Sequence, residues 1–315
     1  IIELMNKSIV LNICGVKSLG GLKIAENAIK SISESQFDLI LLHNNNLPVN
    51  TSATVDFVEI ETDLHRFFHP YLNIFLGEKE ISLINNSDAT IHLGNFGFKT
   101  KNKSFVMIQN ILPFEKKDFK NIVLRYFVHK SFKQSDYVIY QLDHVTESIK
   151  KHFHNKLIGI GEIKKSLKNL NPQVGIISII SNIRNKNSTF LQNVLDEVSN
   201  ANPNIKITKI TSEEANKDVS SKNFLQSLKE HSIYLHASFY ETVGLPLYEA
   251  SSNGLFVVGP DKNYMNYFDN GNSAKYSENN VSSAVLQIQK ILVAKHKNYE
   301  SLFYIENWNR VLEII

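Results

Sequence analysis

The most informative part of the sequence about the fold is Ile233-Tyr-Leu-His-Ala-Ser-Phe-Tyr-Glu241-Thr-Val-Gly244-Leu-Pro246-Leu-Tyr-Glu249-Ala-Ser-Ser-Asn-Gly254-Leu-Phe-Val-Val258. Its apolar ends and polar middle predict a buried strand, a loop, a helix and a second buried strand. Pro246 suits the first turn of a helix, where its missing N–H costs nothing, and Gly254 suits the position after the last turn. The N–H groups at the start of such a helix attract anions, most often a phosphate.

The residues just before the predicted helix are suited to ligand binding. Gly244 has no side chain, so the backbone can approach a ligand closely, and the N–H groups of Val243, Gly244 and Leu245 are expected to face it. Two carboxylates, Glu241 and Glu249, flank this point. Carboxylates repel a phosphate but accept hydrogen bonds from hydroxyl groups, which favours a phosphate ligand that carries a ribose or a hexose. The alternative is a surface helix with two solvated glutamates.

The spacing of these residues resembles a known signature. Glu241 and Glu249, with Gly244-Leu-Pro246 between them and Gly254 after them, resemble the E-x7-E motif of the family 4 retaining glycosyltransferases. The resemblance implies an α/β protein of GT-B fold, with two Rossmann-like domains facing each other across a cleft. It also implies that Glu249 accepts the ribose hydroxyls, that Glu241 contacts the transferred sugar, and that the N–H groups of residues 243–245 hold the diphosphate.

A second candidate loop lies earlier in the same half of the chain. Residues 174–181 form an apolar run of strand length, and Arg184 and Lys186 follow it directly. Members of the family carry an Arg and a Lys here that bind the donor diphosphate, and two cations suit a leaving group that gains negative charge. The spacing is shorter than the usual one, so which phosphate each residue reaches stays open. The alternative is a pair of solvated loop cations.

The first half of the chain also begins like a Rossmann-like unit. An apolar run at residues 8–14 precedes Gly20 and Gly21, and helical spacing follows at 22–32. The glycines do not form G-x-G-x-x-G, so nothing here indicates NAD. By resemblance, Gly20 and Gly21 lie near the donor phosphates; the alternative is a plain tight turn. Strands alternate with helices through this half, which predicts a mostly parallel sheet.

Polar residues follow several of these strands. Because ligands bind at the carboxyl ends of strands in such sheets, His92, Asn95, Gln109 and Asn110 are candidates. Relatives place a histidine where Gln109 and Asn110 stand. An amide holds a sugar hydroxyl but cannot act as a base, so Asn110 is expected to bind substrate and His92 remains the candidate for catalysis. The alternative for His92 is a hydrogen-bonded structural histidine.

Composition limits the class of protein. The chain has 315 residues, enough for two domains, and no apolar run near the roughly 20 residues that span a membrane. Cys14 is its single cysteine, so no disulfide framework or thiolate metal cluster is expected. We expect a cytoplasmic protein without a signal peptide. Met5 is expected to be the natural start, with residues 1–4 additional to it.

The charge of the chain is unevenly distributed. Residues 97–168 contain 15 Lys and Arg against 6 Asp and Glu, whereas the whole chain has a net charge of only +3. Within them, residues 114–133 interleave aromatic and aliphatic side chains with lysines, as basic helices that lie on anionic lipid do. The protein would then lie at the inner face of the plasma membrane. The alternative is an ordinary helix whose apolar face lies in the core. No nucleic-acid partner is expected.

The order of apolar and polar segments along the sequence also predicts the domain boundaries. We expect a first, acceptor-binding domain at residues 1–155 and a nucleotide-sugar domain at 156–297. Residues 298–315 are expected to form a helical tail that packs back on the first domain. Residues 161–172 are expected to be a polar, lysine-rich connector, and residues 64–75 a helix.

The resulting prediction is a hexosyltransferase. It would move a hexose or N-acetylhexosamine, with retention, from a UDP- or GDP-sugar to a glycan or lipid-linked acceptor, in the synthesis of a surface polysaccharide such as lipopolysaccharide. No cofactor or metal is expected, because the chain lacks the Asp-x-Asp pair of metal-dependent glycosyltransferases. A nucleotide-sugar epimerase on the same fold and a non-catalytic binding protein are the alternatives.

Overall fold

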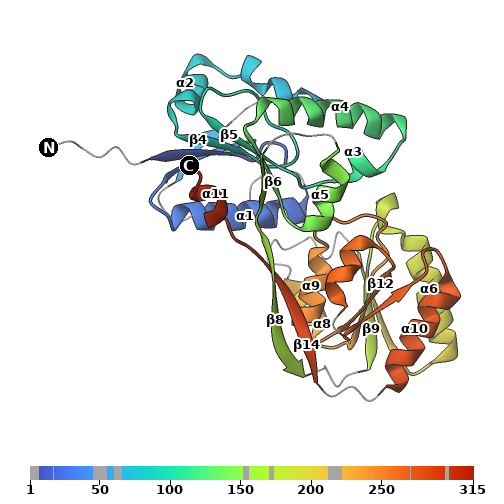
Figure 1. Cartoon of the computed structure of the whole chain (residues 1–315). Helices are drawn as coiled ribbons and strands as arrows, with labels where there is room; N and C mark the ends of the chain where they lie inside the picture. The colour runs from blue at the N-terminus through green and yellow to red at the C-terminus, as the bar shows by residue number, and fades with distance from the viewer. Residues whose placement is uncertain are drawn as a thin grey trace. The chain divides into compact units, whose positions relative to one another are not determined.

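The structure is a computed structural model that describes residues 7–16, 18–44, 55–59, 66–151, 156–169, 174–211, 222–269, 271–294 and 298–315. It divides into two compact units. The first contains residues 1–162 and 306–315, and the second contains residues 163–305. Both are α/β units built on a parallel sheet (Figure 1).

The first unit contains a seven-stranded parallel sheet in the order β3-β2-β1-β4-β5-β6-β7. The strand β1, third in this order, pairs on both sides, with Ile9 opposite Leu39 of β2 and Ala89 of β4. Strands buried on both faces are apolar throughout, which explains the continuous run at the start of the chain. The strands are β1 (Ser8–Asn12), β2 (Asp38–His43), β3 (Val55–Glu59), β4 (Ala89–His92), β5 (Lys103–Met107), β6 (Tyr137–Tyr140) and β7 (Lys156–Gly159).

Helices cover both faces of this sheet. Along β1, Ile9 and Leu11 belong to one core with Trp308, whereas Val10 points into a second core with Phe98. Figure 1 shows α1 on one side of the sheet and α2 and α4 on the other. The helical elements are α1 (Leu19–Ser33), η1 (Arg66–Ile74), α2 (Glu78–Asn86), α3 (Leu112–Glu115), α4 (Phe119–Gln134), α5 (Asp143–Ile149) and α11 (Asn309–Leu312).

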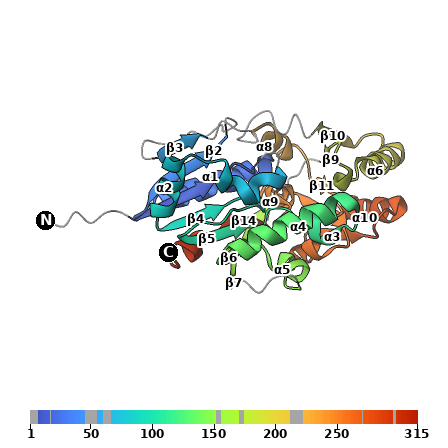
Figure 2. The same cartoon turned by 90° about the horizontal axis from the view of Figure 1, so that it is seen from above.

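The second unit repeats the plan with five parallel strands in the order β10-β9-β11-β12-β13. Ile176, Ile233 and Val258 of its central strands pack against Val194 in one core. Figure 2 shows α6 and α10 side by side. The elements are β9 (Gly175–Ile180), η2 (Arg184–Lys186), α6 (Ser188–Ala201), β10 (Lys206–Thr211), α8 (Lys222–Leu228), β11 (Ile233–Leu235), α9 (Leu245–Ser252), β12 (Phe256–Pro260), η3 (Asn263–Phe268), β13 (Ser273–Tyr276) and α10 (Val281–Val293).

The structure also contains a separate two-stranded sheet. It pairs β8 (Gly161–Asn169) with β14 (Asn298–Glu306). The expectations of a polar connector at 161–172 and of a helical segment from 298 to Trp308 were therefore wrong. The strands are held by contacts that are distant in sequence: Lys165 Nζ lies 2.8 Å from Glu300 Oε2, and Ser301 Oγ donates to Ser166 O at 3.0 Å.

The basic segment at 114–133 is not one helix. It divides into α3 and α4, because Asp118 adopts an extended conformation and its carboxylate accepts a hydrogen bond from the N–H of Asn121 at 3.0 Å. A side chain that accepts from this N–H defines a helix start. The helix expected at 64–75 is the 3₁₀ helix η1, which contains Pro70; residues 64 and 65 lie outside the described part.

The last residues of the chain belong to the first unit. Trp308 is 1% exposed and packs, with Val311, against the core on the α1 side of the sheet. Its indole N–H donates to Glu306 Oε2 at 3.1 Å. The units thus divide after residues 162 and 305, whereas we expected boundaries after 155 and 297. None of the described helices has the length and hydropathy to cross a membrane.

Candidate functional site

The candidate site of the second unit is built from two loops at the carboxyl edge of its sheet. Residues 181–187 follow β9 and residues 236–244 follow β11. The loops are joined by two hydrogen bonds: Phe239 N donates to Asn185 O at 2.9 Å, and Asn185 Nδ2 donates to Tyr240 O at 2.8 Å. Ligands of parallel α/β sheets bind at this edge, so the two loops form one candidate binding surface.

The loop after β9 is shaped by short-range hydrogen bonds. Ser181 N donates to Ser188 Oγ at 2.8 Å, and that hydroxyl donates to Ser181 O at 2.6 Å. Asn187 has a φ of 51° and precedes α6, in a left-handed conformation that asparagine tolerates better than most residues. This turn exposes Arg184 to solvent and directs Lys186 towards the second loop.

Glu241 lies at the centre of the site. Its Oε1 is 2.5 Å from Lys186 Nζ and 3.3 Å from His236 Nε2, and its side chain is 12% exposed. Burial by itself raises the pKa of this carboxyl, but the Lys186 ammonium and the His236 ring outweigh burial, and the pKa lies well below its usual value. Glu241 is therefore a buried, ionised carboxylate.

Three buried tyrosines hold the loop that carries Glu241. The hydroxyl of Tyr276 donates to His236 O at 2.7 Å, and that of Tyr264 donates to Ser238 O at 2.5 Å. The hydroxyl of Tyr234 lies 3.3 Å from His236 Nδ1. Burial, followed by the nearby charges of Glu241 and Glu249, raises the pKa of Tyr234 well above its usual value. The three hydroxyls therefore fix the backbone of this loop and the ring of His236.

Gly244 forms the junction between Glu241 and α9. Its φ is +73°, and a Cβ built there would lie 2.8 Å from Leu247 Cδ1 and 3.5 Å from Glu241 Cγ. Any side chain at this position would be strained by the positive φ and would clash with Leu247, whereas its contact with Glu241 would be an ordinary one. Pro246 lies in the first turn of α9, whose N-cap residue is Gly244, so the N-cap supplies no side-chain acceptor. In this turn the N–H of Leu247 donates to Gly244 O at 2.8 Å.

The other residues of this unit that were predicted to belong to the site lie either next to α9 or in the loop after β9. Val243 is buried, and Leu245 and Glu249 are partly exposed on the first turns of α9, as the motif requires. Arg184 is exposed and pairs with no carboxylate in the described part of the chain. The unit thus brings Lys186 and Glu241 into contact but does not bring Arg184 to Glu241.

In the first unit, Gly20 and Gly21 lie in the first turn of α1. Ser18 caps this helix, because its Oγ accepts from Gly21 N at 3.1 Å. A Cβ on Gly21 would lie 2.8 Å from Val16 Cγ1 and 3.2 Å from Gln109 Oε1, whereas one on Gly20 would meet nothing within 4 Å. Gly21 is therefore required by packing, and Gly20 faces open space.

Asn95 organises the loop that carries Gln109 and Asn110. Its φ is 75°, its Oδ1 accepts from the N–H groups of Gln109 at 2.6 Å and Asn110 at 2.9 Å, and its Nδ2 donates to Asn110 O at 2.6 Å. The side chain of Asn110 accepts from Leu112 N at 2.9 Å, just before α3. Asn110 thus has a local structural role, and its expected contact with a sugar stays a prediction.

His92 is completely buried in β4. Its Nδ1 lies 3.0 Å from Asn12 Nδ2, and its ring meets that of Phe98 edge-on at 4.7 Å. Burial lowers the pKa of His92 to about 3, so the ring is neutral in the folded protein near pH 7. This position favours the structural interpretation of His92 over the catalytic one.

We expect His92 to make the protein sensitive to acid. Its folded pKa lies below the unfolded value of 6.5, so between about pH 6.5 and 3 the unfolded chain binds more protons and stability falls as the pH is lowered. The slope from this group is at most about 1.4 kcal/mol per pH unit. His92→Gln, which keeps an acceptor for Asn12, should flatten the dependence. Urea unfolding between pH 4.5 and 7.5 measures it, and parallel curves for the two proteins would contradict the expectation.

Several residues of the site were not predicted from the sequence. Asn185, Tyr234 and His236 are all buried and all contact the Glu241 loop or its partners. Only their nearness to Arg184, Lys186 and Glu241 in the sequence pointed to them. Among the described residues, no cluster of three His, Cys, Asp or Glu side chains has the arrangement of a metal site.

Comparison with proteins of known structure identifies the fold. No protein-family model matches the sequence, and no curated protein sequence matches it. The crystal structure of WaaG, a glycosyltransferase involved in lipopolysaccharide biosynthesis, matches with a TM-score of 0.67 at 10% identity, over 91% of this chain and 90% of that chain. A TarM mutant of S. aureus, in complex with fondaparinux, alpha-GlcNAc-glycerol and UDP, matches with a TM-score of 0.63 at 11% identity, over 91% and 93%.

A third structure agrees with these two. Anabaena Alr3699/HepE, in complex with UDP and glucose, matches with a TM-score of 0.61 at 12% identity, over 91% of this chain and 90% of that chain. At such low identities the likeness shows the fold alone. Two Rossmann-like units with these sheet orders, matched over nine-tenths of the chain, confirm the prediction that this protein has the GT-B fold.

Proposed function

We propose that this protein is a retaining glycosyltransferase that moves a hexose or N-acetylhexosamine from a nucleotide-diphosphate sugar to a glycan or lipid-linked acceptor. The carrying observation is the part-buried Lys186–Glu241 contact beside Gly244 and the start of α9. It places a cation, a carboxylate and a helix N-terminus within one small surface. A diphosphate linked to a sugar is the ligand that needs all three.

Each group then has a role in the reaction. Lys186, Arg184 and the N–H groups of residues 243–245 stabilise the diphosphate as it gains charge. Glu249 accepts the ribose hydroxyls, and Glu241 positions the sugar and stabilises positive charge at its anomeric carbon. The bond from that carbon to the phosphate oxygen breaks as the acceptor oxygen attacks from the same face, and the acceptor proton passes to the leaving phosphate. This scheme needs no protein nucleophile and no metal ion.

The structural neighbours support a nucleotide sugar as donor. The TarM mutant and Alr3699/HepE were both solved with UDP, and the second also with glucose. We extend this to the present chain and propose a donor of the UDP or GDP type. WaaG acts in lipopolysaccharide biosynthesis, which supports a surface polysaccharide as the product class here.

The decisive experiment is a donor panel. The protein is incubated with UDP-, GDP- and dTDP-sugars, and release of the nucleoside diphosphate is followed with and without sugar acceptors. Release that rises with acceptor supports a transferase, and NMR of the product tests retention. An epimerised nucleotide sugar without transfer would favour an epimerase, and binding without turnover would favour a non-catalytic protein. Either result would overturn the proposal.

We further propose that the first unit contacts anionic membrane through residues 114–133. Within them, α4 contains Lys120, Arg125, Lys130 and Lys133 but no acidic residue. Instead of being buried, Phe119 is 81%, Ile122 51% and Tyr126 64% exposed. Exposed apolar side chains among cations are typical of helices that lie in a lipid interface. The protein would then act at the inner face of the plasma membrane.

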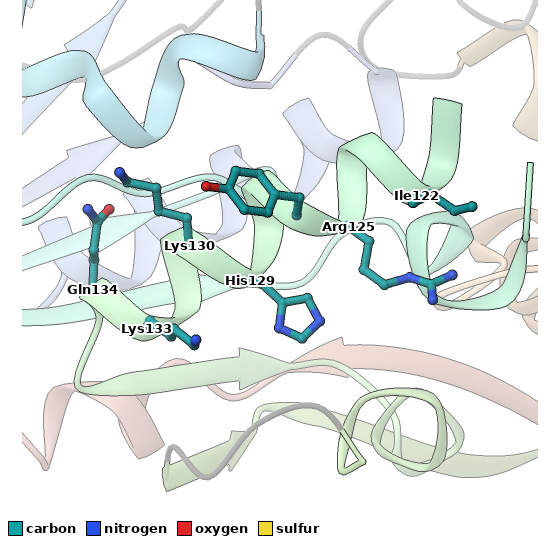
Figure 3. Close-up of a pocket in the computed structure, with 7 residues that line it drawn as sticks. Ile122, Arg125, His129, Lys130, Lys133 and Gln134 are labelled. Atoms are coloured by element: carbon teal, nitrogen blue, oxygen red, sulfur yellow. The ribbon is translucent and has the colours of Figure 1, made fainter. Parts of the chain in front are cut away.

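The contacts of α4 show which of its cationic side chains are already engaged by other residues of the first unit. A pocket of about 520 Å³ lies along this helix, and Figure 3 shows His129 and Lys133 projecting to the same side. Arg125 is engaged, because Nε donates to Pro113 O at 2.6 Å and Nη2 to Lys116 O at 3.0 Å. Lys130 lies 3.8 Å from the centre of the Tyr71 ring of η1, and this helix also exposes Phe68 and Ile74.

Charge reversal on this surface is therefore expected to abolish vesicle binding. Lys117, Lys120 and Lys133 are exposed, and replacing all three by glutamate should remove co-sedimentation with phosphatidylglycerol vesicles, because each cation near an anionic surface contributes about 1 kcal/mol. Reversal of Lys30, Lys150 and Lys290, which are exposed elsewhere, is the matched control. Equal binding of the two triple variants, or equal binding to phosphatidylcholine vesicles, would refute the proposal.

A further inference from the structure

We propose that His236 is the positioning residue for Glu241, and that Tyr234, His236 and Glu241 form a hydrogen-bonded chain that holds the carboxylate when Lys186 engages the donor. This inference rests on the proposed function. Nothing in the spacing of the motif assigns a role to His236, which lies between β11 and Glu241. The role follows from the geometry of the buried side chains.

Tyr234 and His236 are buried, Glu241 is 12% exposed, and each of the three side chains lies next to the following one. The Tyr234 hydroxyl lies 3.3 Å from His236 Nδ1, and His236 Nε2 lies 3.3 Å from Glu241 Oε1. Tyr234 is 1% and His236 5% exposed. The backbone of His236 is fixed as well, because its carbonyl accepts from the Tyr276 hydroxyl at 2.7 Å and its N–H donates to Val258 O at 2.8 Å.

Which atom donates in each contact follows from the groups on either side of His236, Tyr234 and Glu241. Burial raises the pKa of this phenol well above its usual value, so its hydroxyl keeps its proton. Such a hydroxyl can donate or accept, but the ionised carboxylate of Glu241 only accepts, so the nitrogen that faces it is the protonated one and Nδ1 of His236 accepts from Tyr234. A neutral imidazole then carries its proton on Nε2. The Nε2–H group therefore faces Glu241 Oε1 across 3.3 Å, a contact that is longer than a full hydrogen bond in this structure.

The surroundings of His236 keep its ring neutral. Burial lowers its pKa most, and the Lys186 ammonium lowers it further, against the opposing effect of Glu241. The other neighbouring groups are the phenols of Tyr234 and Tyr264, whose ring meets that of His236 edge-on at 5.9 Å. His236 thus acts as a neutral donor and adds no charge that would compete with Lys186.

Glu241 needs a second partner because Lys186 is shared between this carboxylate and the proposed donor diphosphate. It pairs with Glu241 in this structure, and the proposed function requires it to bind the donor diphosphate. As the diphosphate attracts the ammonium, Glu241 loses part of its main contact while its side chain remains 12% exposed. A buried carboxylate without enough donors is costly and moves or takes up a proton. The Nε2–H group of His236 prevents both.

The test compares His236→Leu with His236→Gln, because the amide of Gln places a donor near the position of Nε2. We expect His236→Leu to lower kcat about 10- to 100-fold, as loss of a supporting hydrogen bond does at other sites, with a donor KM within about threefold of wild type. His236→Gln should recover most of the loss. In His236→Leu the acid limb of the kcat profile should move to higher pH, because the pKa of Glu241 rises.

Two controls separate this inference from the proposed function. His231→Gln alters another buried histidine of the same unit, which contacts Ser227 and Thr208, and should leave kcat unchanged. NMR titration of the glutamate carboxyls compares Glu241 in wild type and in His236→Leu without any substrate. If the wild type neither binds nor turns over nucleotide sugars, the proposed function fails, but a higher pKa of Glu241 in the variant still supports the chain. An unchanged pKa, or equal kcat for the Leu and Gln variants, overturns the inference.

Discussion

Glu241→Ala is expected to lower the kcat of sugar transfer by about 100- to 1,000-fold, the range found when a group that stabilises transition-state charge is removed. In the wild type, Lys186 and His236 hold this carboxylate ionised, against the effect of burial, next to the proposed site of reaction. Stability should change little, because Lys186 is one-third exposed and its ammonium can turn to water once its partner is lost. Turnover and thermal unfolding of the variant measure the two effects.

The matched control for this variant is Glu230→Ala. Glu230 also pairs with a lysine at 2.5 Å, Lys206, but both side chains are about half exposed and lie outside the two site loops. It should retain wild-type turnover. Glu241→Gln keeps the size of the side chain and loses the charge, so it separates electrostatic stabilisation from hydrogen bonding. Turnover of Glu241→Ala within twofold of wild type would show that this carboxylate is not part of the reaction.

Lys186→Ala is expected to have a comparable effect and a distinct pH signature. The variant loses a cation for the diphosphate, which should cost about 100-fold or more in kcat/KM. It also leaves Glu241 with burial as the main influence on its pKa, which therefore rises. Because the carboxylate must be ionised, turnover of the variant should fall at a higher pH than that of the wild type as the solution is acidified. A pH profile of kcat measures this shift.

Lys206→Ala is the control for that variant, since it removes an exposed lysine from an ion pair of the same length. A double-mutant cycle of Lys186→Ala and Glu241→Ala adds a measure of their coupling. Strong non-additivity in turnover is expected, because the two side chains are in direct contact. Additive losses, or a pH profile of Lys186→Ala that coincides with that of the wild type, would contradict the arrangement that we infer.

Much of the fold could be predicted because parallel strands buried on both faces are apolar along their whole length. β9, β11 and β12 were expected close to their observed positions for that reason. The glycines and Pro246 around the E-x7-E motif also act locally, through φ values and missing N–H groups. These features depend on residues near in sequence, so the sequence by itself determined them.

The tertiary structure decided what depends on distant contacts. β8 and β14 were not expected as strands, because their pairing joins residues about 135 positions apart, as between Ser166 and Ser301. The position of His92 between Asn12 and Phe98, and of His236 between Tyr234 and Glu241, likewise follows from packing. A histidine in a sequence is equally suited to a core or to a site. Only burial and the neighbouring groups, which folding brings together, determine which role it has.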